Sequence, residues 1–255
     1  MTPIITIKNL TKHYSAPVLR GINLEIEAGK IIGYIGPNGA GKSTTLKILT
    51  GIIPDFGGDV HVLGMDVRKE ALEIKRKIGF IPENAMLYET LTPMEYLTFI
   101  GQLYEMPILD IEKKAQDLLN LFGLSVNVHQ RMNTFSKGMK QKVLLIAGMI
   151  HNPEIIFLDE PLSGLDANAV ILVKEILVQL RNSGKTIVYS SHIMDVVEKI
   201  SDRIVLINKG EIIANGTFEE LKSTQNSSLE QIFSQLTGST ESTSLTAGQF
   251  LDALK

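Results

Sequence analysis

A glycine-rich run that contains one lysine and one serine follows directly after a short apolar stretch, Ile31–Ile35. The run reads Gly36-Pro37-Asn38-Gly39-Ala40-Gly41-Lys42-Ser43. Its spacing matches G-x-x-x-x-G-K-[ST], in which glycines let the backbone curl so that successive N–H groups point at phosphate oxygens. The run therefore predicts a phosphate-binding loop.

A helix is expected to begin inside this run, at Lys42, because Leu46 and Ile48 follow with helical apolar spacing. Its positive end would face the same phosphates as the loop. Lys42 would reach the β- and γ-phosphates, Ser43 would bind Mg²⁺ through its hydroxyl, and Thr44 would extend the nucleotide contacts. A glycine-rich turn without function is the alternative, which the flanking strand and helix patterns disfavour.

Two acidic residues, Asp159 and Glu160, stand directly after the apolar run Ile155–Leu158. Because that run predicts a buried strand, the carboxylates would lie at its carboxyl end, facing the mouth of the phosphate loop. Asp159 would hold Mg²⁺, since a hard cation prefers oxygen ligands. Glu160 would orient and polarise an attacking water, as a general base does. Without the phosphate loop, an acidic strand end that only begins a turn would be the favoured interpretation.

Composition narrows the function classes. The chain has 255 residues, a formal net charge of −3 and no cysteine, and its pI is about 6.0. This charge gives no general attraction to nucleic acid, so no nucleic-acid partner is expected. Without cysteine the chain forms neither a disulfide nor a thiolate metal site, which fits a reducing interior.

Membrane-directed segments are not evident in the sequence. Residues 1–8 lack the basic segment and long apolar region of a secretory signal, so a cytoplasmic location is expected. The longest apolar stretches, such as Val143–Ile150, are well short of the ~20 residues needed to cross a bilayer. If the protein acts at a membrane, we expect another chain to span it.

Short β-branched runs alternate with longer helical patterns along the chain, which indicates an α/β fold with a mainly parallel sheet covered on both faces. The runs that predict buried strands are Ile31–Ile35, Ile78–Ile81, Ile155–Leu158, Thr186–Ser190 and Ile204–Ile207.

Three segments stand apart from this pattern. Residues 4–28 alternate as short strands and predict an antiparallel sheet beside the main one. From Glu83 to Phe135 the strand signals stop, and Pro93–Tyr104 and Asp110–Phe122 show helical spacing, so residues 84–150 are expected to form an inserted helical subdomain. The tail, residues 237–255, begins poor in apolar residues and is expected to be mobile.

A third motif connects these parts to a known family. The run Phe135-Ser136-Lys137-Gly138-Met139 follows the helical block, and Ser136 is also a good helix N-cap. With the phosphate loop and the acidic pair, this motif resembles the nucleotide-binding subunits of ATP-binding cassette (ABC) transporters, whose signature is usually Leu-Ser-Gly-Gly-Gln. Ser136 and Gly138 match it, and the resemblance implies that they bind the γ-phosphate. Lys137 and Met139 depart from it.

Further positions follow the family's order. Ser163-Gly164-Leu165-Asp166 resembles the loop after the acidic strand, which makes Asp166 a candidate site residue. His192, at the end of a predicted strand, resembles the switch histidine that donates a hydrogen bond to the γ-phosphate. Tyr14 corresponds to the aromatic residue on which the family stacks adenine, although a plain packing role remains an alternative.

Glu83 is the main departure from the family's pattern. The family normally offers a glutamine there to Mg²⁺ and to the attacking water, whereas this sequence reads Ile81-Pro82-Glu83-Asn84. A carboxylate still binds Mg²⁺, but it adds negative charge and donates no hydrogen bond while ionised. We expect Glu83 to keep the metal-sensing role.

The resemblance implies a fold, a reaction and partners. The fold would be an α/β P-loop NTPase with a mainly parallel core sheet, an antiparallel β subdomain and an inserted helical subdomain, over residues 1–236. The reaction would be hydrolysis of ATP with Mg²⁺ by a pair of cassettes, a homodimer of this chain being expected. The pair would drive a separate integral membrane permease, docked near residues 84–104, from the inner face of the cell membrane.

The motif details and the C-terminal segment, residues 229–238, resemble subunits of exporters with separate ABC-2-type permeases. Two other classes stay open. A P-loop kinase would transfer phosphate to an acceptor rather than release it. A soluble ABC ATPase of translation or DNA repair usually carries coiled-coil arms or two cassettes in one chain, and this sequence has one phosphate loop and no sustained heptads.

Overall fold

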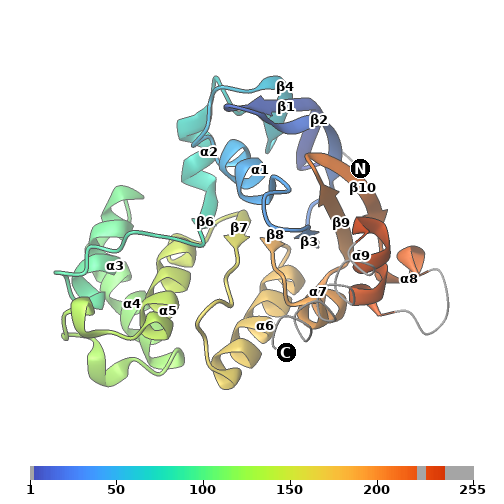
Figure 1. The fold of residues 1–255 in the computed structure, drawn as a ribbon. Helices are drawn as coiled ribbons and strands as arrows, with labels where there is room; N and C mark the ends of the chain where they lie inside the picture. The colour runs from blue at the N-terminus through green and yellow to red at the C-terminus, as the bar shows by residue number, and fades with distance from the viewer. Residues whose placement is uncertain (1–2, 223–227, 239–255) are drawn as a thin grey trace.

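The structure is a computed structural model that describes residues 3–222 and 228–238 of the chain. At its centre is a six-stranded sheet in the order β10-β9-β3-β8-β7-β6 (Figure 1). Neighbouring strands run parallel, except that β10 pairs antiparallel with β9. The strands are β3 (Ile31–Ile35), β6 (Ile78–Ile81), β7 (Ile155–Asp159), β8 (Thr186–Ser190), β9 (Arg203–Asn208) and β10 (Glu211–Gly216).

The inner strands of this sheet are apolar on both faces. Along β3, Ile31 and Ile35 enter one apolar cluster, whereas Ile32 and Tyr34 enter the other. Side chains alternate across a strand, so a continuous apolar run is stable only when both faces are covered. The predicted parallel α/β sheet is confirmed: three of the five expected strands have the predicted bounds, and β7 and β9 extend slightly beyond them.

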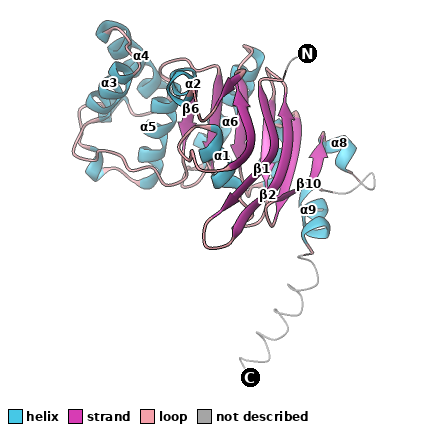
Figure 2. Cartoon of the chain, turned by 90° about the horizontal axis from the view of Figure 1, so that it is seen from above, coloured by secondary structure: helices cyan, strands magenta, loops and turns pink. Residues whose placement is uncertain are grey.

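A second, four-stranded sheet in the order β2-β1-β4-β5 covers one side of the core (Figure 2). Its strands are β1 (Ile5–His13), β2 (Pro17–Ile26), β4 (Gly57–Val62) and β5 (Met65–Asp66), and all pairs are antiparallel. The antiparallel sheet predicted for residues 4–28 is confirmed, but the contribution of β4 and β5 was not predicted.

Helix α1 (Lys42–Leu49) lies between the two sheets, and its apolar residues join the cluster that also contains β1 and β3 residues (Figure 1). The helix begins at Lys42, as predicted. The opposite face of the core sheet is covered by α6 (Ala167–Asn182) and α7 (Met194–Ile200). A short α2 (Ala71–Lys77) leads directly into β6.

A lobe of helices stands beside the core sheet at the β6 edge (Figures 1 and 2). It contains α3 (Pro93–Leu103), α4 (Ile108–Leu121), two short 3₁₀ turns (Ser125–Asn127 and Met132–Thr134) and α5 (Lys137–Met149). Thr92 and Glu95 form a reciprocal capping box at the start of α3, with Pro93 in the first turn. The expected all-helical segment is therefore present, joined to the core through the loop after β6.

The C-terminal part of the described chain contains α8 (Phe218–Leu221) and α9 (Leu229–Thr237). Leu229 and Ile232 are buried, and α9 packs against α7. Most of the predicted tail, residues 239–255, lies outside the described residues, and the division at residue 236 remains a prediction. None of the helices in residues 3–222 and 228–238 has the length and apolar character required to cross a membrane.

Candidate nucleotide-binding site

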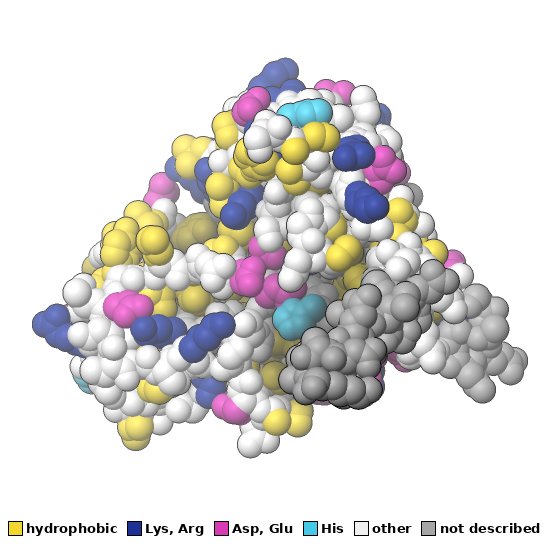
Figure 3. Space-filling view, in the orientation of Figure 1, with side chains coloured by type: hydrophobic (Ala, Val, Ile, Leu, Met, Phe, Trp, Pro, Cys, Tyr) yellow, Lys and Arg dark blue, Asp and Glu magenta, His cyan; other side chains and the backbone are white. Residues whose placement is uncertain are grey.

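A pocket of about 570 Å³ opens where β3, β7 and β8 end. Carboxyl ends of parallel strands are the usual place for a ligand in such sheets. Acidic side chains and a histidine gather at the centre of this face, between the β-rich part and the helical lobe (Figure 3). The pocket is lined by Val18, Asn38, Gly39, Gly41, Lys42, Ser43, Thr44, Glu83, Asp159, Glu160 and His192.

The glycine-rich run forms the tight loop expected before α1. Gly39 and Gly41 have φ values of 78° and 108°, which side-chain-bearing residues rarely adopt. A Cβ at Gly36 would lie 2.2 Å from the Ile207 backbone oxygen. The loop therefore needs glycine both for its curvature and for its close approach to β9.

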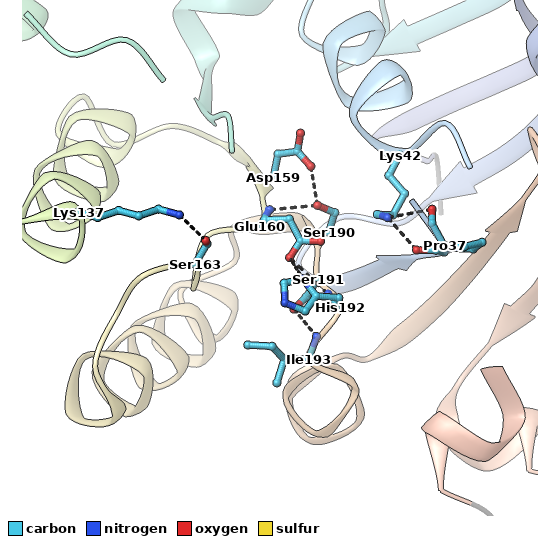
Figure 4. Close-up of polar contacts among 11 residues, drawn as sticks. Pro37, Lys42, Lys137, Asp159, Glu160, Ser163, Ser190, Ser191, His192 and Ile193 are labelled. Atoms are coloured by element: carbon cyan, nitrogen blue, oxygen red, sulfur yellow. Dashed lines mark hydrogen bonds and ion pairs between the residues drawn. The ribbon is translucent and has the colours of Figure 1, made fainter. Parts of the chain in front are cut away.

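Lys42 is only 8% exposed and lies over this loop. Its ammonium donates hydrogen bonds to the backbone oxygens of Gly36 (2.7 Å) and Pro37 (3.3 Å), as Figure 4 shows. A cation is thus held beside a helix N-terminus and a curl of backbone N–H groups. This combination favours a polyanionic ligand such as a nucleotide triphosphate.

Ser190, at the end of β8, connects the two candidate carboxylate residues. Its hydroxyl donates to Asp159 Oδ1 (2.6 Å) and accepts from the Glu160 backbone N–H (3.1 Å) (Figure 4). Asp159 is 2% exposed and Ser190 is fully buried. The sequence interpretation did not assign this role to Ser190; a hydroxyl at a strand end, beside the strand that carries the acidic pair, is the signal that would have found it.

Glu160 has a φ of 50°, in the left-handed region that non-glycine residues seldom occupy. Strained backbone of this kind is retained where surrounding contacts hold it, and it is common at functional sites. The Glu160 side chain is 12% exposed, and its Oε2 lies 2.8 Å from His192 Nδ1. Because an ionised carboxylate only accepts, this geometry assigns the proton to Nδ1 and leaves Nε2 of the exposed imidazole available to a ligand.

Three predicted magnesium ligands, Ser43, Glu83 and Asp159, line the same pocket. Their hydroxyl and carboxylate oxygens are of the type that Mg²⁺ prefers. Within the described residues, no group of three or more His, Cys, Asp and Glu side chains is placed to hold a metal alone. One hydroxyl and two carboxylates are a donor set of the kind with which proteins bind Mg²⁺ together with phosphate oxygens.

Ser136 and Gly138 do not line this pocket. Ser136 caps α5, because its hydroxyl accepts a hydrogen bond from the Met139 backbone N–H (3.2 Å), which confirms the predicted N-cap. Both residues lie at the start of the helix, where N–H groups and the dipole favour an anion. Asp166 also lies outside the pocket lining and caps α6, where the hydrogen bond from the Ala169 N–H lowers the pKa of its carboxyl.

Tyr14 is 58% exposed and does not line the pocket either. The ammonium of Lys12 lies 4.9 Å from its ring centroid, within cation–π range. Lys12 is itself 5% exposed and pairs with the Asp55 carboxylate at 2.9 Å. Lys12 therefore supports the ring of Tyr14, a contact that the sequence interpretation missed.

Size alone does not locate the site. A larger hollow, of about 830 Å³, is lined by residues of the antiparallel sheet and of the other end of the core sheet, among them Lys8, Glu25 and Arg203. It contains none of the motif residues. The smaller pocket is the candidate site because the phosphate loop, the acidic pair and the histidine converge on it.

Two curated proteins illustrate the similarity in sequence. The chain is 43% identical over 210 residues to an uncharacterized ABC transporter ATP-binding protein of Nostoc sp., covering 82% of this chain and 62% of that protein. It is 37% identical over 219 residues to the linearmycin resistance ATP-binding protein LnrL of Bacillus subtilis, covering 86% of this chain and 70% of LnrL. The chain thus spans less than two thirds of the Nostoc relative's length.

Two solved structures show a similarity to the same kind of protein. An ATP-binding subunit of an ABC transporter superposes with a TM-score of 0.85 at 30% identity, covering 91% of this chain and 99% of that chain. The ATP-binding cassette MJ0796, solved as a dimer in a post-hydrolysis state bound to ADP and Pi, gives 0.78 at 28% identity, covering 84% and 98%. The family model described as ABC transporter matches residues 19–163, more than half of the chain. The chain therefore belongs to the ABC transporter family, with the P-loop NTPase fold of its ATP-binding proteins.

Proposed function

We propose that the protein binds ATP with Mg²⁺ and hydrolyses it, as the ATP-binding subunit of a transporter whose permease is a separate chain. The observation that carries the proposal is one pocket lined by the phosphate loop, Asp159, Glu160 and His192. These groups supply an anion cradle, a metal ligand, a base and a hydrogen-bond donor. Phosphoryl transfer to water requires this combination of positioning and charge stabilisation.

Each residue has a distinct task in this proposal. Lys42 and the loop N–H groups bind the phosphates, while Ser43, Asp159 and Glu83 supply oxygens to Mg²⁺, which neutralises charge on the phosphates. Glu160 orients the attacking water and accepts its proton. The contact between Glu160 and His192 Nδ1 fixes both side chains and presents Nε2 of His192 toward the γ-phosphate. Nε2 donates a hydrogen bond there when the ring carries a proton on both nitrogens.

A second copy of the chain completes the site. Ser136 belongs to the signature and is exposed at the start of α5. It does not line the candidate nucleotide-binding pocket of the same chain. We infer that Ser136 and Gly138 bind the γ-phosphate of ATP held by the other copy, with Tyr14 stacking on adenine. The dimeric form of the structural neighbour MJ0796 supports this arrangement. Hydrolysis removes the shared phosphate and so favours opening.

A groove between the core and the helical lobe is the proposed permease contact. It has a volume of about 670 Å³ and is lined by residues of α2, β6, α3 and α5 and of the loop after β6. Met86 and Leu103 in its lining are 98% and 64% exposed. Hydrophobic side chains gather on this flank, above α3 and beside α2 (Figure 3). Exposed apolar groups around a groove favour an apolar protein partner.

Export is the proposed direction, and the inner face of the cell membrane is the proposed location. LnrL is by name a resistance ATP-binding protein, and resistance is commonly achieved by removing the toxic molecule from the cell. The kinase alternative is disfavoured because the chain carries the family's signature residues Ser136 and Gly138, which a kinase does not need. A soluble role in translation or DNA repair has no supporting observation in the described residues.

The hydrolysis part is tested by comparing the purified protein with Glu160→Gln and Lys42→Ala. We expect Glu160→Gln to lower kcat by about 10²- to 10⁴-fold, the usual contribution of a general base. Lys42→Ala is expected to abolish measurable turnover. Product analysis should find free phosphate with no phosphorylated acceptor. Turnover at the unaltered rate in either variant would contradict the assignment.

The permease part is tested with two apolar-to-acidic variants at exposed positions. Met86→Glu places a charge in the groove, whereas Val126→Glu alters a residue that is 89% exposed in a 3₁₀ turn away from the groove lining. We expect Met86→Glu alone to lose co-purification with a membrane protein from detergent-solubilised membranes, while both variants keep ATP turnover. Equal recovery of that partner by both variants would contradict this docking site.

A further inference from the structure

Lys137, which departs from the family's signature, makes a specific contact with the loop that follows the acidic pair. Its Nζ donates a hydrogen bond to Ser163 Oγ at 3.1 Å (Figure 4). Its aliphatic stem lies against Gly164, since a Cβ added there would be 3.0 Å from both Cγ and Cδ of the lysine. The long side chain therefore lies along residues 163–164.

The start of α5 and this loop are also fitted to one another through their backbones. A Cβ at Gly138 would lie 2.7 Å from the backbone oxygen of Gly164. One turn further along α5, the buried Gln141 amide donates to the Pro161 backbone oxygen at 3.0 Å. The loop is thus held by α5 at Pro161, Ser163 and Gly164.

The same loop begins at Glu160. The Ser163 backbone N–H donates to the Glu160 backbone oxygen at 3.2 Å, and Glu160 is the residue with the left-handed φ of 50°. Movement of Ser163 would therefore alter the turn that directs the Glu160 carboxylate. A connected series of contacts runs from Lys137 through Ser163 to Glu160 and on to His192.

We propose that Lys137 is a positioning residue that couples the signature surface of one ATP site to the general base of the other. The proposal rests on the proposed function, in which Ser136 and Gly138 touch ATP held by a second copy. When α5 closes on that ATP, the contact between Lys137 and Ser163 fixes the loop that carries Glu160 of its own site. Lys137 acts through the loop and does not bind phosphate.

A double-mutant cycle tests this link. Lys137→Met keeps an unbranched stem that can pack on Gly164 but removes the amine, and Ser163→Ala removes the acceptor. We expect each change to lower kcat by about three- to tenfold, the kinetic equivalent of one hydrogen bond. The double variant should be no slower than the slower single variant, because both changes break the same contact. KM for ATP should stay within about twofold.

Three further measurements distinguish a loss of coupling between the two ATP sites from general damage to the protein structure. Lys137→Arg retains a donor and should restore most of the kcat. Lys113→Met, which removes an exposed lysine from α4 of the same lobe, should match the unaltered protein. The Hill coefficient for ATP should fall to about 1 in Lys137→Met from a higher value in the unaltered chain, because coupling between sites is lost.

Opposite results overturn the proposal. Multiplicative effects of Lys137→Met and Ser163→Ala would mean that the residues act independently. A large rise in KM in Lys137→Met alone would identify Lys137 as a phosphate ligand. If Lys137→Met left the Hill coefficient for ATP unchanged, the proposed coupling between the two ATP sites would be wrong. A different result would show that the proposed function itself is wrong. The unaltered protein would then turn over ATP no faster than Lys42→Ala.

Discussion

The buried hydroxyl of Ser190 positions both residues of the acidic pair, Asp159 and Glu160. It donates to Asp159 and accepts from the backbone N–H of Glu160. The proposed metal ligand and the proposed general base are thus held in one arrangement by a residue that does not itself line the pocket. The sequence motifs identified both acidic residues as candidate site residues. The hydroxyl that positions them comes from β8, and Ser190 lies 30 residues after Glu160 in the chain. Only the register between β7 and β8 brings it there.

We predict that Ser190→Ala impairs both catalysis and stability. Leaving a buried polar group without its partner costs about 1–3 kcal/mol, and the released Asp159 carboxylate would bind Mg²⁺ less well. ATP turnover as a function of Mg²⁺ concentration should show a lower kcat and a higher half-saturating Mg²⁺ concentration. Urea unfolding measures the stability change.

Ser201→Ala is the matched control, because its hydroxyl bonds to the Tyr189 hydroxyl at 3.0 Å, away from Asp159. It should leave the Mg²⁺ dependence unchanged. If Ser190→Ala and Ser201→Ala had the same Mg²⁺ dependence, the role assigned to Ser190 would be wrong.

Glu83 carries a second prediction at the scale of one residue. It lines the pocket together with Ser43 and Asp159, which is compatible with the metal-sensing role predicted from its place in the sequence. Glu83→Gln keeps an oxygen ligand but removes a negative charge and adds a donor. We expect a changed Mg²⁺ dependence and a changed rate of ATP hydrolysis. An unchanged rate and dependence would make Glu83 a hinge or surface residue.

Individual elements differ in how well their local sequence specifies them. β3, β6 and β8 were predictable because continuous apolar runs between glycine, proline or polar residues favour buried strands. β4 begins with Gly57 and Gly58, and Gly58 has a φ of 87°, so its sequence lacks a clear strand pattern. Its pairing with β1 specifies β4, and such long-range pairing cannot be deduced from local propensity.

Helix caps explain where the functional helices start. Ser136 caps α5 and Asp166 caps α6, and in both cases a motif residue assigned to nucleotide binding also has a structural role in its own chain. The capping role of Ser136 followed from its residue type. The capping role of Asp166 was missed, because the family resemblance directed the interpretation toward the nucleotide.

The Asp166 cap predicts a pH effect on stability. The hydrogen bond from the Ala169 N–H lowers the pKa of this carboxyl in the folded state. The cap is therefore fully stabilising above the ordinary carboxyl pKa, and its contribution is lost as the pH falls through the lowered folded pKa. Asp166→Asn keeps a capping side chain that does not titrate.

Urea denaturation at neutral and acidic pH measures this effect. Asp166→Ala should be less stable than the unaltered protein at pH 7, whereas Asp166→Asn should be nearly equal to it. Below about pH 5 the unaltered protein should lose stability more steeply than Asp166→Asn. Equal pH slopes for the two would show that Asp166 does not cap α6 as an ionised group.

At the scale of the whole molecule, the arrangement of lobes separates two surfaces. The phosphate loop and acidic pair lie on the core, while the signature lies at the start of α5 in the helical lobe (Figure 1). The pocket that holds the first set does not include Ser136 or Gly138. A single copy therefore lacks part of the ligand shell that the family motif implies, and a second copy can supply it.

The motif residues that line the pocket could be found in the sequence, because each motif depends on residue types at fixed spacing. Contacts between segments distant in sequence, such as Lys12 with Tyr14 and Asp55 or Lys137 with Ser163, depend on how the elements pack. A lysine in a sequence gives no indication of which loop it will reach. For that reason the residues that position the site were visible only in the structure.

Sedimentation velocity of Glu160→Gln with ATP and Mg²⁺ is the most direct test of the central claim, that two copies enclose ATP between the loop of one and the signature of the other. Blocking hydrolysis should trap the closed pair, so we predict a dimer with ATP and Mg²⁺, a monomer with ADP, and a monomer when Ser136→Phe is added. A Glu160→Gln protein that binds ATP yet sediments as a monomer at every concentration would contradict the account.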